Sequence, residues 1–369
     1  MARACKVFMT SFYDTVCDYK NVELAFRKAR RGKTQRHYVI EFEAELEKNL
    51  LQLQDELQNH TYAPRPLDTF ILRDGKTRRI SRSDFRDRVV HHALCNVIEP
   101  LFDKTFIFDS YANRKGKGVL KALQRFDVFK GKVSKNHTRR CFVLKADIRR
   151  YFDTVDHGKL MEILGKQVED ERVLWLVRAI LDNFERGRGK GMPLGNLTSQ
   201  FFANVYLNEL DQFVKHKLRA RYYLRYVDDF VLLSKSRCEL EIFKERINEF
   251  LRQCVLLQLH PEKSRIIAYE QGVPFLGMRV FPFHRLLLRK NLNKFKRKRT
   301  MLEQSFKEEH SSYDVLFESL EGWLAFAKSA NTFGLRKRIL KEFEEVNKGE
   351  FSTKELNNYV KEEEKFRLS

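Results

Sequence analysis

The sequence has few features of a membrane protein, of a disulfide-rich secreted protein or of a protein stabilised by a structural metal ion. Its longest stretch without a charged residue, residues 191–208, contains Pro193 and several polar, turn-forming residues, which excludes a membrane span there. The six cysteines lie far apart and include no Cys-x-x-Cys pair, so neither a zinc site nor a disulfide framework is indicated, and we expect each to be a buried, inert thiol. Asp14 interrupts any apolar leader. The sequence therefore predicts a cytoplasmic protein without a membrane partner.

Acidic residues are also in the minority. The chain has 71 Lys and Arg against 50 Asp and Glu, so its formal net charge is +21. This balance excludes an acidic solvating tail and predicts a polyanionic partner. Hydrophobic residues make up 43% of the chain and include 31 Phe and 13 Tyr, which is enough for a sizeable core, so we do not expect a disordered protein. The length of 369 residues predicts two or three subdomains.

Apolar periodicity and turn residues predict the elements of the N-terminal part. Leucines at three- and four-residue spacing predict a helical layer that extends over residues 21–59. Residues 62–81 contain two β-rich pieces on either side of Gly75, which predicts a β-hairpin surrounded by basic side chains. A further helix is expected over residues 83–99, where Pro100 ends it.

The C-terminal part shows a change of character near His284. Before it, helices are predicted over residues 159–183, 198–219 and 238–253. After it, residues 285–299 contain eight basic and no acidic side chains, and the remainder of the chain is helix-forming. We therefore place a domain boundary near His284.

Three carboxylates stand at the ends of predicted strands. Residues 141–148 form a short apolar run that delivers Asp147 to its end, and residues 222–234 predict a hairpin with Asp228 and Asp229 in the turn. The order of the elements fits a βαββ-type sandwich, in which neighbouring strands would bring the three carboxylates together. Crowded carboxylates favour a divalent cation, and oxygen ligands suit Mg²⁺. Two such ions, about 3.5–4 Å apart, clamp the attacking and departing oxygens of an in-line displacement. The alternative to a metal site is that Asp147 is an ordinary residue at the end of a strand and that Asp228 and Asp229 form a solvated turn.

Four blocks of sequence then carry a resemblance to a known family. They are LKADIRRYFDTVDH (residues 144–157), GMPLGNLTSQFFANVYLNELD (191–211), RYVDDFVLL (225–233) and FLGMRV (275–280). In this order and spacing the chain resembles bacterial reverse transcriptases from about Arg73 to the C-terminal basic run. It most resembles the enzymes of diversity-generating retroelements, which are similar to group II intron enzymes but lack their maturation and endonuclease domains. The chain length leaves no room for those domains, and Gln200 stands where most relatives have proline.

The resemblance implies an α+β right-hand polymerase fold of fingers, palm and thumb. It divides the chain into an N-terminal helical layer (1–59), fingers (60–140), a βαββ-type palm (141–284, with fingers elements near 159–195) and a helical thumb (285–369).

The same resemblance implies roles for individual residues. Asp147, Asp228 and Asp229 are expected to bind metal, assisted by the backbone carbonyl of Ile148. Phe152 is expected to lie against the sugar and exclude a 2′ hydroxyl, which selects deoxynucleotides. The remaining implied assignments are Lys76 and Arg78 on the triphosphate, Lys263 as the proton donor to pyrophosphate, and Leu194, Gly195 and Gln200 beside the incoming nucleotide.

Nucleic-acid contacts are expected at two loops and one helix. The predicted residues are Arg114 and Lys115 in a basic loop, Phe275, Leu276 and Gly277 in the primer grip, and Lys296, Arg297, Lys298 and Arg299 in the thumb. Leu194 departs from the glutamine that many reverse transcriptases carry before this glycine, and it cannot make the polar contact of that side chain. The diversity-generating enzymes also have an aliphatic residue here and misincorporate opposite template adenine. Lowered fidelity is what the resemblance implies.

The sequence thus predicts an RNA-directed DNA polymerase that uses two Mg²⁺ ions, with Mn²⁺ as an alternative. It would copy a template RNA into error-rich cDNA for diversification of a target gene. Its implied partners are the template RNA, a DNA or RNA primer, the cDNA, dNTPs and a small basic ring-forming accessory protein. The alternatives are a retron, group II intron-like or phage-defence reverse transcriptase, and a non-catalytic RNA-binding protein on a polymerase fold. Phe152 opposes an RNA-synthesising polymerase.

Overall fold

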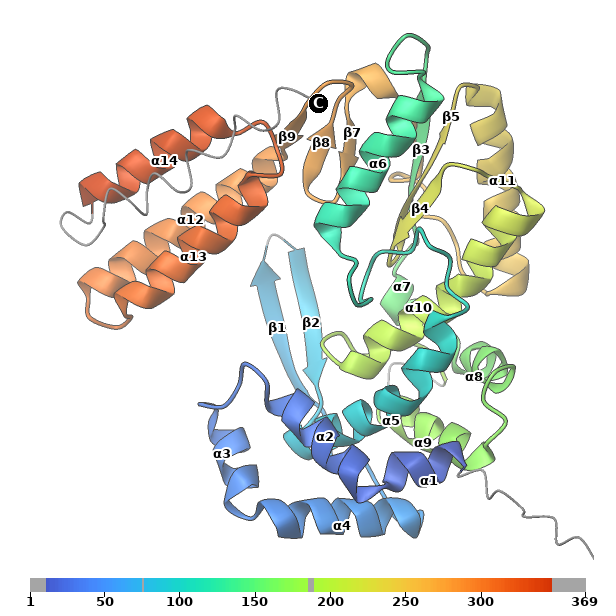
Figure 1. Cartoon of the computed structure of the whole chain (residues 1–369), viewed down its shortest axis with the longest axis vertical. Coiled ribbons are helices and arrows are strands. Elements are labelled where there is room, and N and C mark those ends of the chain that lie inside the picture. The colour runs from blue at the N-terminus through green and yellow to red at the C-terminus, as the bar shows by residue number, and fades with distance from the viewer. Residues whose placement is uncertain (1–10, 75, 185–188, 347–369) are drawn as a thin grey trace, which may run out of the picture. The chain divides into compact units, whose positions relative to one another are not determined.

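The computed structural model describes residues 11–74, 76–184 and 189–346 (Figure 1). The chain forms two compact units. The first comprises residues up to 122 together with 146–232 and 238–265, and the second comprises 123–145, 233–237 and the residues from 266 onward.

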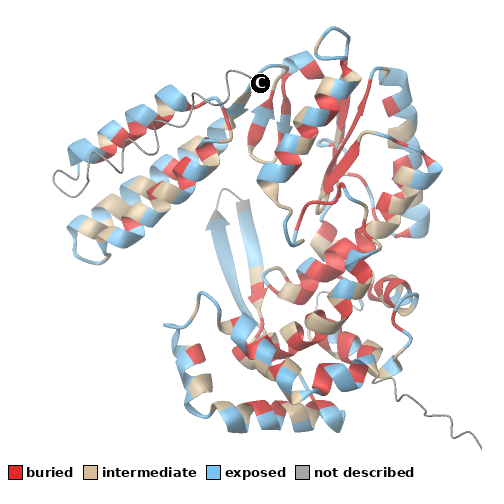
Figure 2. Ribbon diagram, in the orientation of Figure 1, coloured by how far each residue is buried: buried red, intermediate tan, exposed pale blue. Residues whose placement is uncertain are grey.

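Four short helices form the N-terminal part of the first unit. They are α1 (Phe12–Cys17), α2 (Tyr19–Arg30), α3 (His37–Ala44) and α4 (Leu46–Gln58). The helical layer predicted over residues 21–59 is present as α2, α3 and α4, and the chain leaves helical geometry after α2 and turns at Gly32, whose φ is 70°. The leucine spacing in α4 is confirmed as a core-facing stripe, with Leu50, Leu53 and Leu57 fully buried (Figure 2).

A two-stranded hairpin follows, as predicted. Strands β1 (Asp68–Asp74) and β2 (Lys76–Arg82) pair antiparallel. The predicted turn residue Gly75 lies outside the described residues. The next helix, α5 (Phe85–Asp103), continues past Pro100, so the predicted stop there is wrong. Pro100 removes only its own N–H donor, while Phe102 is buried against the ring of Phe201 at 5.7 Å and holds the last turn in place.

Helices complete the first unit. They are α7 (Tyr151–Thr154), α8 (His157–Gly165), α9 (Glu171–Asp182), α10 (Leu197–Gln212) with a π-helical extension (Phe213–Lys217), and α11 (Arg237–Cys254). The helices predicted over residues 198–219 and 238–253 are confirmed. The single helix predicted over residues 159–183 is wrong, because Asp170 stops the chain between α8 and α9 and caps α9 by accepting the N–H of Arg172 at 3.1 Å.

A four-stranded sheet carries the acidic residues. Its strands are β3 (Phe142–Asp147), β4 (Tyr223–Tyr226), β5 (Asp229–Ser234) and β6 (Arg265–Ala268), in the order β4-β5-β3-β6. Strands β4 and β5 are antiparallel with Tyr226 opposite Asp229, so the predicted acidic hairpin is confirmed. The apolar residues of β5 and of β3 are buried, as their sequence indicated, except for Phe142 at the start of β3, which is partly buried.

The second unit contains a small sheet and a bundle of helices. Its elements are α6 (Val119–Val133), β7 (Val273–Phe275), β8 (Met278–Val280), β9 (Arg285–Leu287), α12 (Arg289–Lys307), α13 (Tyr313–Ala327) and α14 (Phe333–Val346). The basic run begins with strand β9, which pairs with β8, and becomes helical only from Arg289. Phe295 of α12 stacks on Trp323 of α13 at 4.1 Å in the core of this bundle.

The cysteines only partly match their prediction. Cys17, Cys95 and Cys141 are buried free thiols, whereas Cys238 and Cys254 are exposed near the two ends of α11. The prediction of burial is wrong for these two because the amphipathic helix turns only residues such as Ile247 and Leu251 toward the core. No helix within the described ranges is both long enough and apolar enough to span a bilayer.

Candidate active site

The ends of two strands bring the predicted carboxylates onto neighbouring backbone segments. Strand β3 ends at Asp147, and the turn between β4 and β5 contains only Val227 and Asp228. The prediction that Asp229 also lies in the turn is wrong, because Asp229 pairs with Tyr226 and begins β5. The backbone N–H of Ile148 donates to the carbonyl of Asp228 at 3.2 Å. The two backbone segments that carry Asp147 and Asp228 are therefore neighbours in the first unit.

Lys263 reaches the same place from a distant segment. Its Nζ lies 3.2 Å from Oδ1 of Asp147, and the two side chains are 41% and 18% exposed, respectively. The N–H of His260 donates to the backbone carbonyl of Asp147 at 2.7 Å, which fixes the approach of the segment that carries Lys263. An ammonium group has three N–H donors, so Lys263 can hydrogen-bond to Asp147 and to a second acceptor at the same time.

The donor chemistry of this site fits a hard divalent cation. Carboxylate oxygens from two adjacent strand ends, with a backbone carbonyl nearby, are ligands that Mg²⁺ or Mn²⁺ prefers. Within the described parts of the chain, no three His, Cys, Asp or Glu side chains already converge as a metal-binding group. The Asp147 carboxylate instead pairs with Lys263.

The predicted nucleotide-contacting residues of two blocks lie side by side. The carbonyl of Phe152 in α7 accepts the N–H of Met192 at 2.7 Å, and its half-buried ring lies 5.3 Å from that of Tyr151. The carbonyl of Leu194 accepts the N–H of Ser81 in β2 at 3.2 Å. These bonds connect the Gly191–Gly195 loop to α7 on one side and to the β1–β2 hairpin on the other.

Gly195 has a conformation that requires glycine. Its φ is 110°, and a Cβ atom there would lie 3.1 Å from Cγ2 of Ile80. Arg78 is exposed on the same strand as Ile80, whereas the side chain of Lys76 lies outside the described side chains. Gln200 is exposed in the first turn of α10.

The basic loop after α5 separates its two predicted nucleic-acid contacts. Arg114 donates to the carboxylate of Asp103 at 2.7 Å and to the carbonyl of Ile107 at 2.8 Å, so its guanidinium holds the loop together. Lys115, the next residue, is exposed. Lys115 is therefore the more available of the two for a phosphate.

Two more predicted surfaces belong to the second unit. In the turn between β7 and β8, Leu276 and Gly277 have φ values of 46° and 85°, and a Cβ on Gly277 would lie 2.6 Å from Nδ2 of Asn291. The glycine that the FLG turn was expected to need is confirmed. The ring of Phe275 is buried and stacks on Phe126 at 5.7 Å, so it supports the turn from below.

The four predicted contacts on helix α12 are likewise not equivalent. Lys296, Arg297 and Lys298 are exposed. Arg299 is largely buried and forms ion pairs with Glu303 at 3.2 Å and with Glu342 at 3.0 Å. The first three present a basic surface, whereas Arg299 connects α12 to α14.

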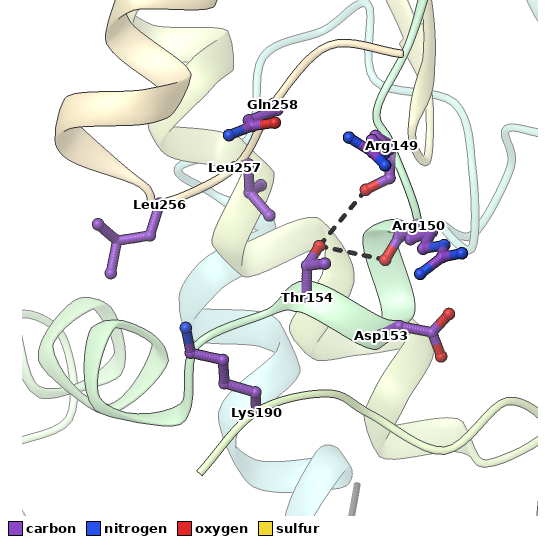
Figure 3. A pocket seen from close by; sticks show the side chains of 8 residues that line it. All are labelled: Arg149, Arg150, Asp153, Thr154, Lys190, Leu256, Leu257 and Gln258. Atoms are coloured by element: carbon purple, nitrogen blue, oxygen red, sulfur yellow. Dashed lines mark hydrogen bonds between the residues drawn. The ribbon is translucent and has the colours of Figure 1, made fainter. Parts of the chain in front are cut away.

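Sequence reasoning missed a pocket that is lined in part by the residues that follow Asp147 in the chain. It has a volume of about 280 Å³ (Figure 3). The lining residues are Arg149, Arg150, Asp153, Thr154, Lys190, Leu256, Leu257 and Gln258. The Thr154 hydroxyl donates to the Arg150 carbonyl at 3.1 Å, and the Arg149 N–H donates to the Gln258 carbonyl at 2.9 Å. The signal was the pair of arginines two and three residues after Asp147, which makes the strand end electropositive.

A second feature that the sequence reasoning missed is a buried ion pair. Arg225 of β4 and Asp211 of α10 are both 0% exposed, and their Nη2 and Oδ2 atoms are 2.6 Å apart. The available signal was a charged residue inside an otherwise apolar strand, because a buried charge requires a partner.

Comparisons with known proteins identify the family of the chain. The family model described as "Reverse transcriptase (RNA-dependent DNA polymerase)" matches residues 71–280. Protein YkfC of Escherichia coli is 27% identical over 278 residues, which cover 64% of this chain and 72% of that protein. The group II intron-encoded protein LtrA of Lactococcus lactis is 21% identical over 302 residues, which cover 63% and 49%. Nuclear intron maturase 1 of Arabidopsis thaliana is 32% identical over 110 residues, which cover 29% and 14%.

The chain therefore spans most of YkfC but about half of LtrA and a small part of the plant maturase. Among solved structures, telomerase from Candida albicans in complex with a fragment of telomeric RNA is similar at a TM-score of 0.50 and 13% identity, over 80% of this chain and 57% of that one. The mixed α and β architecture is that of the right-hand polymerase fold, as the sequence predicted.

Proposed function

Because this chain belongs to the reverse transcriptase family, whose model matches residues 71–280, we propose that it copies a template RNA into error-rich cDNA at Asp147, Asp228 and Asp229. Membership makes it an RNA-directed DNA polymerase, and such enzymes use divalent metal ions. The observation that best supports the proposed centre is the hydrogen bond from the Ile148 N–H to the Asp228 carbonyl, because it joins two acidic strand ends from separate blocks.

The chemistry follows from the groups at this site. The three aspartates, with the Ile148 carbonyl, would hold two Mg²⁺ or Mn²⁺ ions, and bound cations supply charge neutralisation for phosphoryl transfer. The 3′ hydroxyl of the primer loses its proton to solvent water, and its oxygen bonds to the α-phosphorus of a dNTP as the bond from that phosphorus to the α–β bridging oxygen breaks. Lys263, 3.2 Å from Asp147, donates a proton to the departing pyrophosphate.

Substrate selection would use the residues around this centre. Lys76 and Arg78 of the hairpin grip the triphosphate, and Phe152 excludes the 2′ hydroxyl of a ribonucleotide. The template RNA, the primer and the cDNA would follow the exposed cations Lys115 and Lys296 and the turn at Gly277. The site of action would be the cytoplasm, with a small basic ring-forming protein as an accessory.

Primer extension on a defined RNA with Mg²⁺ tests the polymerase. We expect cDNA from the parent enzyme and none from Asp228→Asn, while Glu245→Gln, which removes an exposed carboxylate from α11, serves as the matched control with parental activity. Efficient extension by Asp228→Asn would show that the centre lies elsewhere.

Low fidelity rests on Leu194, whose backbone is held against β2 by the Ser81 N–H at 3.2 Å. An aliphatic side chain supplies shape to the nascent base pair but no hydrogen bond, so wrong pairs lose little there. We predict that Leu194→Gln raises fidelity opposite template adenine, by up to about tenfold, at some cost in rate. Sequencing the products copied from one RNA by both enzymes measures this. Leu194→Ile is the control, because it preserves the aliphatic character.

A group II intron-like role is the second candidate, because LtrA and the plant maturase are intron proteins by their names and share sequence with this chain. The same sequencing experiment separates the two roles. Errors concentrated at template adenines support diversification of a target gene. A parent enzyme that copies adenine as accurately as the other bases contradicts it and favours the intron-like role.

A further inference from the structure

A buried arginine lies directly before the acidic turn. Arg225 of β4 and Asp211 of α10 form a two-pronged ion pair, with Nε to Oδ1 at 2.8 Å and Nη2 to Oδ2 at 2.6 Å, and neither side chain is exposed. The hydroxyl of Tyr223 donates to Oδ1 of Asp211 at 2.6 Å. Burial raises the pKa of Tyr223, so this hydroxyl stays protonated.

The remaining donors of the same guanidinium reach the turn itself. Nη1 of Arg225 donates to the backbone carbonyl of Val227 at 3.1 Å and to Oδ1 of Asn204 at 3.2 Å. Val227 has a φ of 54°, a left-handed conformation that is unfavourable for a β-branched residue. The next residue is Asp228. The strained backbone directly before Asp228 is thus held by the hydrogen bond from Nη1 of Arg225 to the Val227 carbonyl.

The network also reaches the start of the basic loop. The backbone N–H of Arg225 donates to the Asp109 carbonyl at 2.9 Å, and its carbonyl accepts the N–H of Tyr111 at 3.0 Å. Nη2 lies 3.3 Å from Oγ of Ser110, and Nδ2 of Asn204 donates to the carbonyl of Ala112 at 2.8 Å. The segment that leads to Lys115 is therefore tied to the same strand as the turn.

We infer that Arg225 is a positioning residue for polymerisation: its guanidinium, anchored on Asp211, sets the conformation of the Val227–Asp228 turn from which the metal ligands project. This rests on the proposed function of Asp228 as a ligand. A planar fork with five donors makes the ion pair and the bonds to Val227, Asn204 and Ser110 at once, whereas a lysine ammonium cannot reach acceptors in these divergent directions.

Fold stability alone does not require this arrangement. A buried ion pair is frequently no more stable than well-packed apolar side chains of the same volume. Burial by itself would lower the pKa of Arg225, but the paired Asp211 carboxylate outweighs it and the net direction is upward, so the charge is permanent. A permanently charged donor keeps its bond to the Val227 carbonyl at every working pH.

The test compares Arg225→Lys with a buried control on the same scaffold. Tyr206→Phe removes an equally buried hydrogen bond, from the α10 hydroxyl to the Val255 carbonyl at 2.7 Å, which does not touch the turn. Mn²⁺ binding to the full chain is measured by electron paramagnetic resonance, and primer extension is measured as a function of Mg²⁺ concentration at a temperature where each variant is folded.

We expect Arg225→Lys to weaken Mn²⁺ binding by about tenfold or more and to raise the Mg²⁺ concentration for half-maximal rate similarly, because a hydrogen bond to a charged group is worth about that factor. Tyr206→Phe is expected to leave both at the parental value. If Arg225→Lys does not fold, Asn204→Ala, which preserves the ion pair but removes one acceptor from the same nitrogen, is expected to shift both in the same direction by a few-fold.

Parental metal affinity in Arg225→Lys, or an equal shift in Tyr206→Phe, would overturn the positioning role and make Arg225 a stability residue only. These outcomes differ from failure of the proposed function. A parent chain that binds Mn²⁺ but does not extend a primer would contradict the polymerase proposal, while the comparison of Mn²⁺ affinities would still decide the role of Arg225.

Discussion

Two acid–base pairs in the first unit differ in what they can do. Asp147 and Lys263 are 3.2 Å apart and partly exposed, at 18% and 41%. Asp211 and Arg225 are 2.6 Å apart and fully buried. In the exposed pair, Nζ of Lys263 donates to one oxygen of Asp147, whereas the buried pair is two-pronged and is part of a network that includes Tyr223 and Asn204.

The difference shows that the buried pair can stabilise the structure while the exposed pair stays available for chemistry. An exposed pair contributes about 0–1 kcal/mol to stability, so Asp147 can exchange its lysine for a cation at little cost. Breaking a buried pair leaves an uncompensated charge in the interior. Substitutions in the exposed pair should therefore affect chemistry first, and substitutions in the buried pair should affect stability and the turn together.

The largest effect is expected at the carboxylates. Asp147→Asn and Asp228→Asn should each lower the rate of primer extension by about a thousandfold or more, because a lost metal ligand costs several kcal/mol at the transition state. RNA binding, measured by fluorescence anisotropy, should stay near the parental value because the basic surfaces are intact. If either variant instead lost RNA binding with its activity, the exposed site would be structural and the comparison would fail.

The next largest effect is on stability. Arg225→Met should lower the free energy of unfolding by about 3–5 kcal/mol, because Asp211 is left charged and buried. Lys263→Met, the matched change in the exposed pair, should alter it by about 1 kcal/mol or less. Urea denaturation followed by circular dichroism measures both. Equal losses in the two variants would remove the distinction between the pairs.

A smaller effect is expected at Phe152, whose ring is half-buried and is thus intermediate between the exposed and the buried pair. Phe152→Val should raise ribonucleotide incorporation relative to deoxynucleotide incorporation by about ten- to a hundredfold, since the wall against the 2′ hydroxyl is removed. Competition assays with dCTP and CTP measure the ratio. Tyr151→Phe is the control, because its hydroxyl points to the Ala203 carbonyl at 2.8 Å in the interior. An unchanged ratio in Phe152→Val would make Phe152 a packing residue.

The smallest effect is expected on helix α12, where exposed and paired basic side chains can again be compared. Replacing the exposed Lys296, Arg297 and Lys298 with Gln should weaken RNA binding and flatten its salt dependence by about 0.7–0.9 log units per lost phosphate contact. Arg299→Gln should leave the salt slope unchanged and lower stability instead, because Arg299 is paired with Glu303 and Glu342. A parental slope in the triple variant would contradict a nucleic-acid-binding thumb.

Local pattern predicted well wherever an element has one buried face. The strand that ends at Asp147, the hairpin that contains Asp228, and helices α10 and α11 were all evident from apolar spacing and turn residues. The errors were boundaries within helical stretches. Gly32 and Asp170 interrupt helices whose flanking composition is uniformly helix-forming, and helical periodicity cannot register a change of direction by so few residues.

The sequence by itself determined which segments carry carboxylates and where the basic runs lie. Only the tertiary structure decided which charges are available. Arg114 and Arg299 were indistinguishable in sequence from Lys115 and Lys298, yet the first two are held by Asp103 and by Glu303 with Glu342, respectively. The contact of Arg225 with the turn could likewise not be predicted from the sequence, because its partner Asp211 lies 14 residues away on another element. Pairing of charges depends on distance in space, and a linear pattern contains that distance only within a single helix or strand.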